Sequence, residues 1–359
     1  MDTKRTTIPS PGLLMIVGTY TSSGSKGVYA YGVQPVSGTA TQLAAVQVLN
    51  PSYVAINPDH SRIYAVSENG PDDSMVAAIG LDCHTGRMRV LGSVNSCGWS
   101  PCHIAMIGTG ALAVANYGSG SLAVLGINAD GTVAACRQLL QWDDHGSPPR
   151  QATSHLHFSM PTPDGRRLIA TNLGGDCLYV MRIGHGGSGT PTLSEERVVR
   201  VADGCGPRHF VFSRSGTMLH VLTELSCEVM TFGYSSESDR LQLLQSVKIA
   251  QSGAGGDIQL SPDGLTLYAS VRCSGCDGVA IMRITPEGLP EVVAFQPTGG
   301  HPRSLAITPD GRLLMAACRD SNAVQVYARD AESGLLTHVS GSDVSVSMPV
   351  CVKFVDPNR

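Results

Sequence analysis

Two sets of charged side chains recur at fixed distances from turns in this sequence. His157, Arg208 and Arg303 each lie six residues before a Pro-Asp-Gly turn or its equivalent, and Glu224 and Arg272 lie ten residues after one. An imidazole or a carboxylate can act as a general base, and guanidinium groups bind anions through paired hydrogen bonds. If the fold brings these positions together, they form an anion-binding site whose general base is either Glu224 or His157.

The turns belong to a unit that is repeated about six times, with clear copies starting at Pro51 and His301. Each copy has a short apolar run, the turn, a run of β-branched or aromatic residues, and a third alternating run, which is the pattern of consecutive hairpins. The copies stand about fifty residues apart, a period typical of four-stranded propeller blades. The turns are Pro58-Asp59, Pro163-Asp164-Gly165, Arg214-Ser215-Gly216, Pro262-Asp263-Gly264 and Pro309-Asp310-Gly311, with a weaker copy near Gly108.

Strands at the two ends of the chain remain outside the six internal copies. The N-terminal runs 13–20 and 27–33 and the C-terminal run 348–354 together supply a seventh blade. The sequence therefore predicts an all-β fold, a seven-bladed β-propeller whose last blade is closed by N- and C-terminal strands. Such closure removes the exposed sheet edges that promote aggregation. We expect a flexible N-terminal segment over residues 1–12 and one propeller domain over 13–359.

The topology of a blade also predicts where the chemistry lies. If the first strand of each blade starts at one face and the second strand returns to it, residues before the first and after the second share that face. This places the base and the arginines at one mouth of the propeller. His103 occupies the same place as His157 by inspection, so we expect His103 and Arg303 to contact the substrate.

Composition and charge exclude several other functions. Only 15% of the residues are charged and the net charge is −4, so neither nucleic acid nor a membrane surface is an expected partner. The apolar run 13–17 is too short for a signal segment or a membrane span, which makes the cytoplasm the expected location. Eleven cysteines fit a reducing compartment with free thiols, and the pair Cys273 and Cys276 lacks further zinc ligands.

Several motifs resemble the lactonase propeller family, which includes bacterial propeller-type 6-phosphogluconolactonases and fungal carboxymuconate lactonizing enzymes. The resemblance extends over nearly the whole chain, and its most specific part is the spacing from Gly-Pro-Arg-His to Glu-Leu. The motifs are Gly18-Thr-Tyr-Thr21, His155-Leu-His157, Gly206-Pro-Arg-His209, Thr223-Glu-Leu225 and Ser270-Val-Arg272. By this resemblance the catalytic residues are His157, Arg208, Glu224 and Arg272.

The resemblance implies a metal-independent lactonase of the pentose phosphate pathway, without a cofactor, that hydrolyses a sugar-acid lactone such as 6-phosphogluconolactone. The expected partner is this small anionic lactone, and the protein is expected to be a monomer or a weak homo-oligomer. Two alternatives stay open. One is a cycloisomerase of the carboxymuconate type, which would use the same base and arginines. The other is a propeller without catalytic activity that binds other proteins, in which Arg208 and Glu224 form a structural ion pair.

Overall fold

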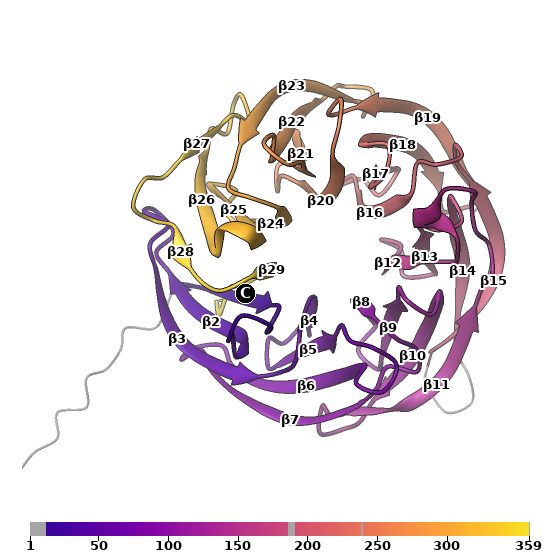
Figure 1. The fold of residues 1–359 in the computed structure, drawn as a ribbon, viewed down its shortest axis with the longest axis horizontal. Coiled ribbons are helices and arrows are strands. Elements are labelled where there is room, and N and C mark those ends of the chain that lie inside the picture. The colour runs from indigo at the N-terminus through magenta and orange to yellow at the C-terminus, as the bar shows by residue number, and fades with distance from the viewer. Residues whose placement is uncertain (1–11, 186–190, 238–239, 359) are drawn as a thin grey trace, which may run out of the picture.

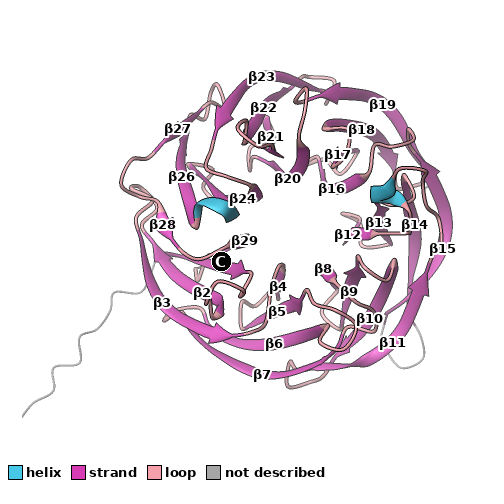
Figure 2. Cartoon of the chain, viewed as in Figure 1, coloured by secondary structure: helices cyan, strands magenta, loops and turns pink. Residues whose placement is uncertain are grey.

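Seven β-sheets surround a central axis in the computed structural model, which describes residues 12–185, 191–237 and 240–358 (Figure 1). The blades follow one another around the ring in chain order, which confirms the predicted seven-bladed β-propeller. The helices among the described residues are two single 3-10 turns, η1 (Pro149–Gln151) and η2 (Arg319–Ser321) (Figure 2). No helix in this part of the chain is long and apolar enough to cross a membrane.

Each blade runs from an inner strand at the axis to an outer strand at the rim. The inner strands are β29 (Pro349–Val355), β4 (Val54–Ile56), β8 (Pro101–Ile107), β12 (Leu156–Pro161), β16 (Pro207–Phe212), β20 (Ala254–Leu260) and β24 (Pro302–Ile307). The second strands are β1 (Leu13–Thr19), β5 (Arg62–Ser67), β9 (Ala111–Asn116), β13 (Arg167–Asn172), β17 (Met218–Thr223), β21 (Thr266–Arg272) and β25 (Leu313–Cys318).

The remaining strands complete the outer half of each blade. The third strands are β2 (Gly27–Val33), β6 (Met75–Asp82), β10 (Ser121–Ile127), β14 (Cys177–His185), β18 (Glu228–Ser235), β22 (Gly278–Ile284) and β26 (Ala323–Arg329). The outer strands are β3 (Ala40–Gln47), β7 (Arg87–Asn95), β11 (Val133–Gln141), β15 (Pro191–Arg200), β19 (Arg240–Lys248), β23 (Pro290–Pro297) and β27 (Leu336–His338), and β28 (Val344–Ser345) also pairs with β26.

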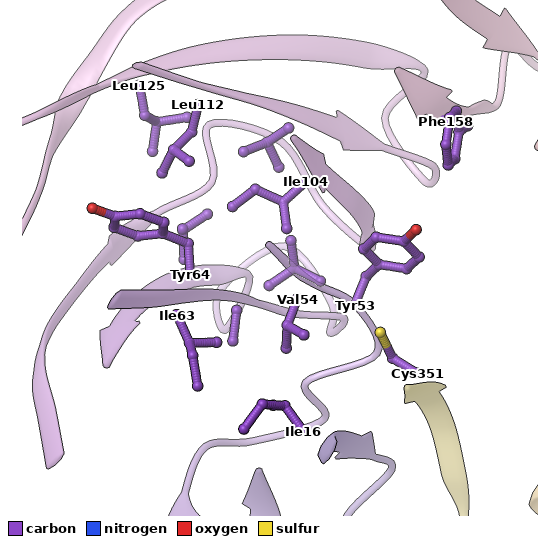
Figure 3. Packing of buried hydrophobic residues seen from close by; sticks show 14 of the residues in the cluster. Ile16, Tyr53, Val54, Ile63, Tyr64, Ile104, Leu112, Leu125, Phe158 and Cys351 are labelled. Carbon is purple, nitrogen blue, oxygen red and sulfur yellow. The ribbon is translucent and has the colours of Figure 1, made fainter. Parts of the chain in front are cut away.

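The position of a strand in its blade follows from its residue pattern. All seven residues of β1 are buried, as expected for a strand that is covered on both faces by neighbouring blades. After its buried first residue, the outer strand β11 alternates between half-buried and exposed residues, because only one of its faces meets another blade. Between blades the apolar side chains interlock, and Ile16, Val54 and Ile104 of three different blades belong to one core cluster (Figure 3).

The first blade is closed by both ends of the chain. Strand β29 pairs with β1 in an antiparallel register in which Val17 faces Val352, and β2 and β3 complete the sheet. This confirms the predicted closure by N- and C-terminal strands. The predicted flexible segment, residues 1–12, lies outside the described residues except for Gly12.

The turns at the end opposite the mouth share one hydrogen-bonding scheme. The hydroxyl of Thr162 donates to Asp164 at 2.6 Å, and the hydroxyl of Thr308 donates to Asp310 at 2.6 Å. Such side-chain contacts stabilise the turn locally, without help from the rest of the fold. Because each inner strand starts a constant number of residues before a turn of constant shape, equivalent residues of different blades reach the mouth at the same level.

Closure of the ring can be tested at Val352, which is fully buried in β29. We expect Val352→Lys to lower the free energy of unfolding by about 4 kcal/mol or more, because it buries an unpaired ammonium group. The matched control is Val293→Lys on the outer strand β23, where the side chain is exposed, and its effect should stay within about 0.5 kcal/mol. Urea unfolding followed by circular dichroism measures both. Equal effects of the two variants would contradict this account of closure.

Candidate active site at the propeller mouth

A β-bulge at the mouth end of the inner strands turns the mouth residues toward the axis. In β12, Leu156 pairs with Asn172 and Phe158 with Thr171, so His157 between them has no partner across the ladder. The same irregularity occurs at Arg208 in β16 and at Arg303 in β24. A bulge redirects the side chain of the extra residue. The charged positions that lie six residues before a turn are therefore the bulged residues of their strands.

These side chains close the channel at the level of the mouth. They surround a cavity of only about 10 Å³, which is room for about one water molecule. The lining residues come from six of the seven blades and are Ser52, Tyr53, Cys102, His157, Arg208, His209, Arg303, Ser304 and Val350. A sugar lactone cannot enter below this layer, so a ligand of that size must bind on the outer side of it, at the mouth.

The carboxylate of Glu224 lies at the centre of a cluster of arginines. Glu224 directly follows β17, and its Oε2 is 2.8 Å from Nε of Arg208 and 3.0 Å from Nη2 of Arg272. Its Oε1 is 2.7 Å from Nη2 of Arg150. The side chains of Glu224, Arg208 and Arg272 are all at least nine-tenths buried. The fold thus brings three of the predicted catalytic residues together and adds one arginine that the sequence analysis missed.

The arginines make Glu224 a poor general base. Burial by itself would raise the pKa of this carboxyl group, but the positive charges of the three arginines outweigh burial and hold the pKa far below its ordinary value. Both carboxylate oxygens are also engaged in ion pairs. A carboxylate that is this well stabilised has little tendency to accept a proton. Glu224 is better suited to orient the arginines than to deprotonate water.

His157 differs from Glu224 because one of its ring nitrogens is not engaged in any hydrogen bond among the described residues. Its side chain is buried against the mouth, and its Nδ1 has no hydrogen-bond partner among the described residues. Burial, together with the positive charge of Arg208, holds the pKa of His157 well below its ordinary value, so the ring is neutral at physiological pH. A neutral imidazole with a free nitrogen can accept a proton. Of the two candidate bases, only His157 has a titratable atom without a hydrogen-bond partner among the described residues, but the burial and positive charges that keep the ring neutral also oppose its protonation, so its role as the general base stays a prediction.

His103 does not occupy the position expected for it. Cys102 is the bulged residue of β8, and His103 lies one residue further along the strand, in a layer below the mouth. Its ring packs between Tyr53, at a centroid distance of 4.3 Å, and Phe158, at 3.9 Å. The alignment by inspection was wrong by one residue, because Cys102 lies six residues before Gly108, the weaker copy of the turn, just as His157 lies six residues before Pro163. A contact between His103 and substrate stays a prediction.

A second layer of charged residues supports Arg208 from below. Nδ1 of His209 is 2.8 Å from Oδ1 of Asp257, whose other oxygen accepts the backbone N–H of Leu305 at 2.9 Å. Nε2 of His209 is 3.1 Å from Nη1 of Arg208. Since Arg208 can only donate, His209 must carry its proton on Nδ1 and donate it to Asp257. The sequence analysis missed Asp257, although it directly follows the mouth position Gly256 in its blade.

Arg303 lies at the other side of the mouth, in contact with residues from the first two blades. Its Nη2 is 3.8 Å from Oε2 of Glu68, and its guanidinium group lies 5.6 Å from the centre of the Tyr20 ring. The hydroxyl of Tyr20 donates to the same carboxylate oxygen at 3.0 Å. Arg303 is therefore held in place before any ligand binds, and its role as a substrate contact stays a prediction.

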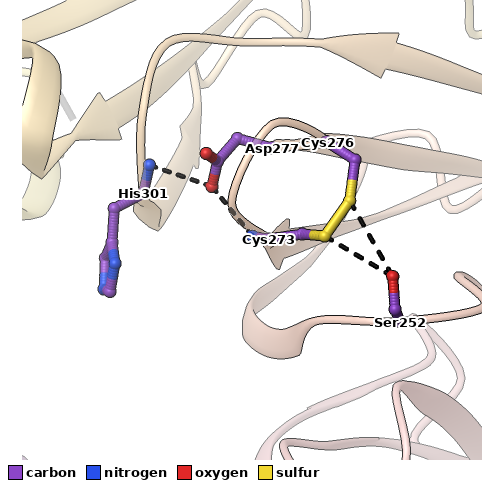
Figure 4. The surroundings of a disulfide bond; sticks show 5 residues. All are labelled: Ser252, Cys273, Cys276, Asp277 and His301. Atoms are coloured by element: carbon purple, nitrogen blue, oxygen red, sulfur yellow. Dashed lines mark hydrogen bonds between the residues drawn. A yellow bond between two sulfur atoms is a disulfide. The ribbon is translucent and has the colours of Figure 1, made fainter.

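The expectation that the cysteines are free thiols is wrong for one pair. Cys273 and Cys276 form a disulfide in the turn that follows Arg272, while the other nine cysteines are free (Figure 4). The Ser-Gly turn brings their Cα atoms to 4.9 Å, a separation that a disulfide can bridge. Asp277 accepts the backbone N–H groups of Cys273 and His301, each at 3.0 Å, and so connects this turn to the next blade.

Comparisons with known proteins place this chain in a family. Residues 14–354 match the model of the family described as "Lactonase, 7-bladed beta-propeller". The chain belongs to this family. It is 30% identical over 348 residues to a 6-phosphogluconolactonase of Bacillus subtilis, covering 94% of this chain and 97% of that protein. It is 29% identical to a 6-phosphogluconolactonase of Formosa agariphila, covering 90% of this chain and 94% of that protein.

A solved structure of the same fold has a different description. The periplasmic gluconolactonase of Pseudomonas aeruginosa superimposes with a TM-score of 0.90 at 30% identity, covering 96% of this chain and 99% of that one. The resemblance to the lactonase propellers that the motifs indicated is thereby confirmed. The relatives' names include both a phosphorylated and an unphosphorylated lactone.

The arginine cluster predicts a large effect of neutralising Glu224. We expect Glu224→Gln to lower the free energy of unfolding by about 3–5 kcal/mol, because it leaves buried guanidinium groups without their counter-charge. Glu291→Gln is the matched control, since Glu291 pairs with Arg283 on the surface and both side chains are more than half exposed. Its effect should remain below about 1 kcal/mol. If urea unfolding shows that Glu224→Gln is as mild as the control, the cluster does not stabilise the mouth.

The buried histidines predict a loss of stability in mild acid. Burial, aided by the charge of Arg208, lowers the pKa of His209 to about 4 in the folded protein, against about 6.5 for an unperturbed histidine. Between these values the unfolded chain binds more protons, so stability falls as pH falls. We expect His209→Gln to reduce the slope of the unfolding free energy against pH, between pH 6.5 and pH 4, by up to about 1.4 kcal/mol per pH unit. The exposed His84→Gln should keep the wild-type slope, and an unchanged slope in His209→Gln would contradict the prediction.

Proposed function

We propose that this protein is a lactonase that hydrolyses 6-phosphogluconolactone to 6-phosphogluconate, a reaction of the pentose phosphate pathway. The observation that carries the proposal is the mouth itself, where buried arginines and a neutral, unpaired His157 converge on one side of a lactonase-family propeller. The two curated relatives named above support the phosphorylated substrate. The reaction class follows from what these side chains can do.

In the proposed reaction a water molecule attacks the carbonyl carbon of the lactone. His157 takes a proton from this water as the new carbon–oxygen bond forms, and the carbonyl oxygen becomes an oxyanion. Arg208, which lines the same small cavity as His157, and Arg272, which shares Oε2 of Glu224 with Arg208, stabilise the negative charge. The bond between the carbonyl carbon and the ring oxygen then breaks, and the ring oxygen leaves as a hydroxyl group with the proton returned by His157. These side chains supply the base and the positive charge, so the proposed step is metal-independent.

Glu224 acts on this reaction through the arginines. Arg208 and Arg272 both contact the same carboxylate oxygen, Oε2. The negative charge of Glu224 offsets the repulsion between the two guanidinium groups, so they can lie close together. His209 and Asp257 fix the far side of Arg208. Preorganised charges of this kind avoid reorganisation during the reaction. Arg303, held by Glu68, is proposed to contact the substrate across the mouth.

The location of the enzyme follows from the proposed substrate. A phosphorylated sugar acid is too highly charged to cross the hydrocarbon core of a membrane unaided. An enzyme of the pentose phosphate pathway is therefore expected in the cytoplasm, where such substrates are made. The surface disulfide between Cys273 and Cys276 would there be exposed to reducing thiols.

Hydrolysis of freshly prepared 6-phosphogluconolactone tests the proposal directly. We expect wild-type protein to accelerate the reaction with or without chelator, and His157→Gln to lower kcat by about 10²–10⁴-fold through loss of the base. His84→Gln, a substitution on a distant hairpin turn, should retain wild-type activity. Circular dichroism would confirm that each variant is folded.

Two outcomes would decide against the proposal. Folded wild-type protein that hydrolyses the lactone no faster than water does would exclude this lactonase activity, and an assay for loss of carboxymuconate would then test the cycloisomerase. Inactivity in both assays would favour the non-catalytic propeller, which predicts the ion pair of Arg208 and Glu224 but does not account for the unpaired His157. Full activity of His157→Gln would exclude this residue as the base.

A further inference from the structure

The three arginines around Glu224 differ sharply in their freedom. The side chains of Arg208 and Arg272 are 2% and 9% exposed, and each also donates to a backbone carbonyl, of Gly256 and Gly255 respectively. The side chain of Arg150 is 60% exposed, contacts Glu224 through Nη2 and also hydrogen-bonds to the hydroxyl of Tyr117. More than half of the Arg150 side chain therefore faces solvent at the mouth.

The backbone that carries Arg150 is nevertheless fixed. Arg150 lies in η1, within the loop that leads from β11 to β12. The neighbouring Gln151 is fully buried, and its side chain donates to the carbonyl of Leu173 at 2.8 Å. The carbonyl of Gln151 also accepts the N–H of Gly146 at 2.9 Å. The position of Arg150 is thus set by buried contacts of its neighbour, while its own long side chain can rotate at the surface.

We infer that Arg150 binds the phosphate group of the substrate and so selects a phosphorylated sugar lactone over an unphosphorylated one. This inference rests on the proposed lactonase function. A guanidinium group binds phosphate through two parallel hydrogen bonds, a geometry that a lysine cannot supply. The ion pair that holds Arg150 is exposed on the arginine side, so solvent screens it more than the buried pairs of Arg208 and Arg272. A phosphate dianion can therefore compete with Glu224 for Arg150.

The exchange leaves the rest of the cluster intact. Arg208 and Arg272 both contact Oε2 of Glu224, whereas Arg150 contacts Oε1. When Arg150 moves to phosphate, Glu224 keeps two buried cationic partners and remains ionised, and its Oε1 becomes free on the side of the mouth. This oxygen can then accept a hydrogen bond from a hydroxyl of the bound sugar. Arg150 thereby distinguishes substrates without taking part in the bond-breaking steps.

The experiment compares Arg150→Gln with Arg312→Gln. Arg312 is the matched control, because it is similarly exposed, 69% against 60%, and also pairs with a carboxylate, but it lies in the β24–β25 turn at the opposite face. For each protein, kcat/KM is measured with 6-phosphogluconolactone and with glucono-δ-lactone. Calorimetry measures the binding of 6-phosphogluconate and of gluconate, and urea unfolding reports the stability of each variant.

We expect Arg150→Gln to weaken the binding of 6-phosphogluconate by about tenfold or more, equivalent to about 1.4 kcal/mol. The ratio of kcat/KM for the phosphorylated lactone to that for the unphosphorylated lactone should fall by a similar factor, mainly through KM. Arg312→Gln should resemble wild type in both measurements. An unchanged ratio and unchanged product binding in Arg150→Gln would overturn the inference.

Failure of the inference and failure of the proposed function give different results. If Arg150→Gln lowers activity on both lactones equally, Arg150 acts through Glu224 and the phosphate assignment is wrong, while the lactonase function stands. If wild type hydrolyses neither lactone, the proposed function is wrong. In that case, comparing how wild type and Arg150→Gln bind 6-phosphogluconate and gluconate still decides whether Arg150 recognises phosphate.

Discussion

The buried carboxylate of Glu224 is the interaction on which the mouth depends. It is the shared counter-charge of three arginines. Arg208 belongs to the same blade, Arg272 to the next blade, and Arg150 to the loop between β11 and β12. Without it, guanidinium groups that are almost fully buried would repel one another in a region of low dielectric constant. One carboxylate therefore links three segments of the ring. Because it is surrounded by three arginines, the cluster still has a net positive charge.

The bulges direct equivalent residues of different blades into one site. A regular inner strand would point alternate residues into the blade interfaces, whereas the extra residue of each bulge leaves the ladder and faces the axis. The layer immediately below, with His209 and Asp257, cannot take part in ligand binding because the cavity above it is too small, and it acts by orienting Arg208. The site is thus two layers deep, with ligand contact restricted to the upper one.

The electrostatics of the mouth assign different roles to its two candidate bases. Both are buried, yet the arginines stabilise the ionised form of Glu224 and disfavour the protonated form of His157. The same cations therefore leave Glu224 charged and His157 neutral at physiological pH. The mouth thus combines a fixed anion that orients cations with a neutral imidazole ring.

The sequence by itself determined the seven blades, their closure and four of the residues at the mouth, because the spacing between a turn and the end of a strand is a local property. Turn counting found His157, Arg208, Glu224 and Arg272 for this reason. Alignment by inspection misplaced His103 by one residue, because the turn near Gly108 is a weak copy, and Arg150 was missed because it lies in a loop outside the repeat. Only the tertiary structure decided which base is neutral, because a pKa depends on burial and on charges that are 16 to 74 residues distant in the sequence.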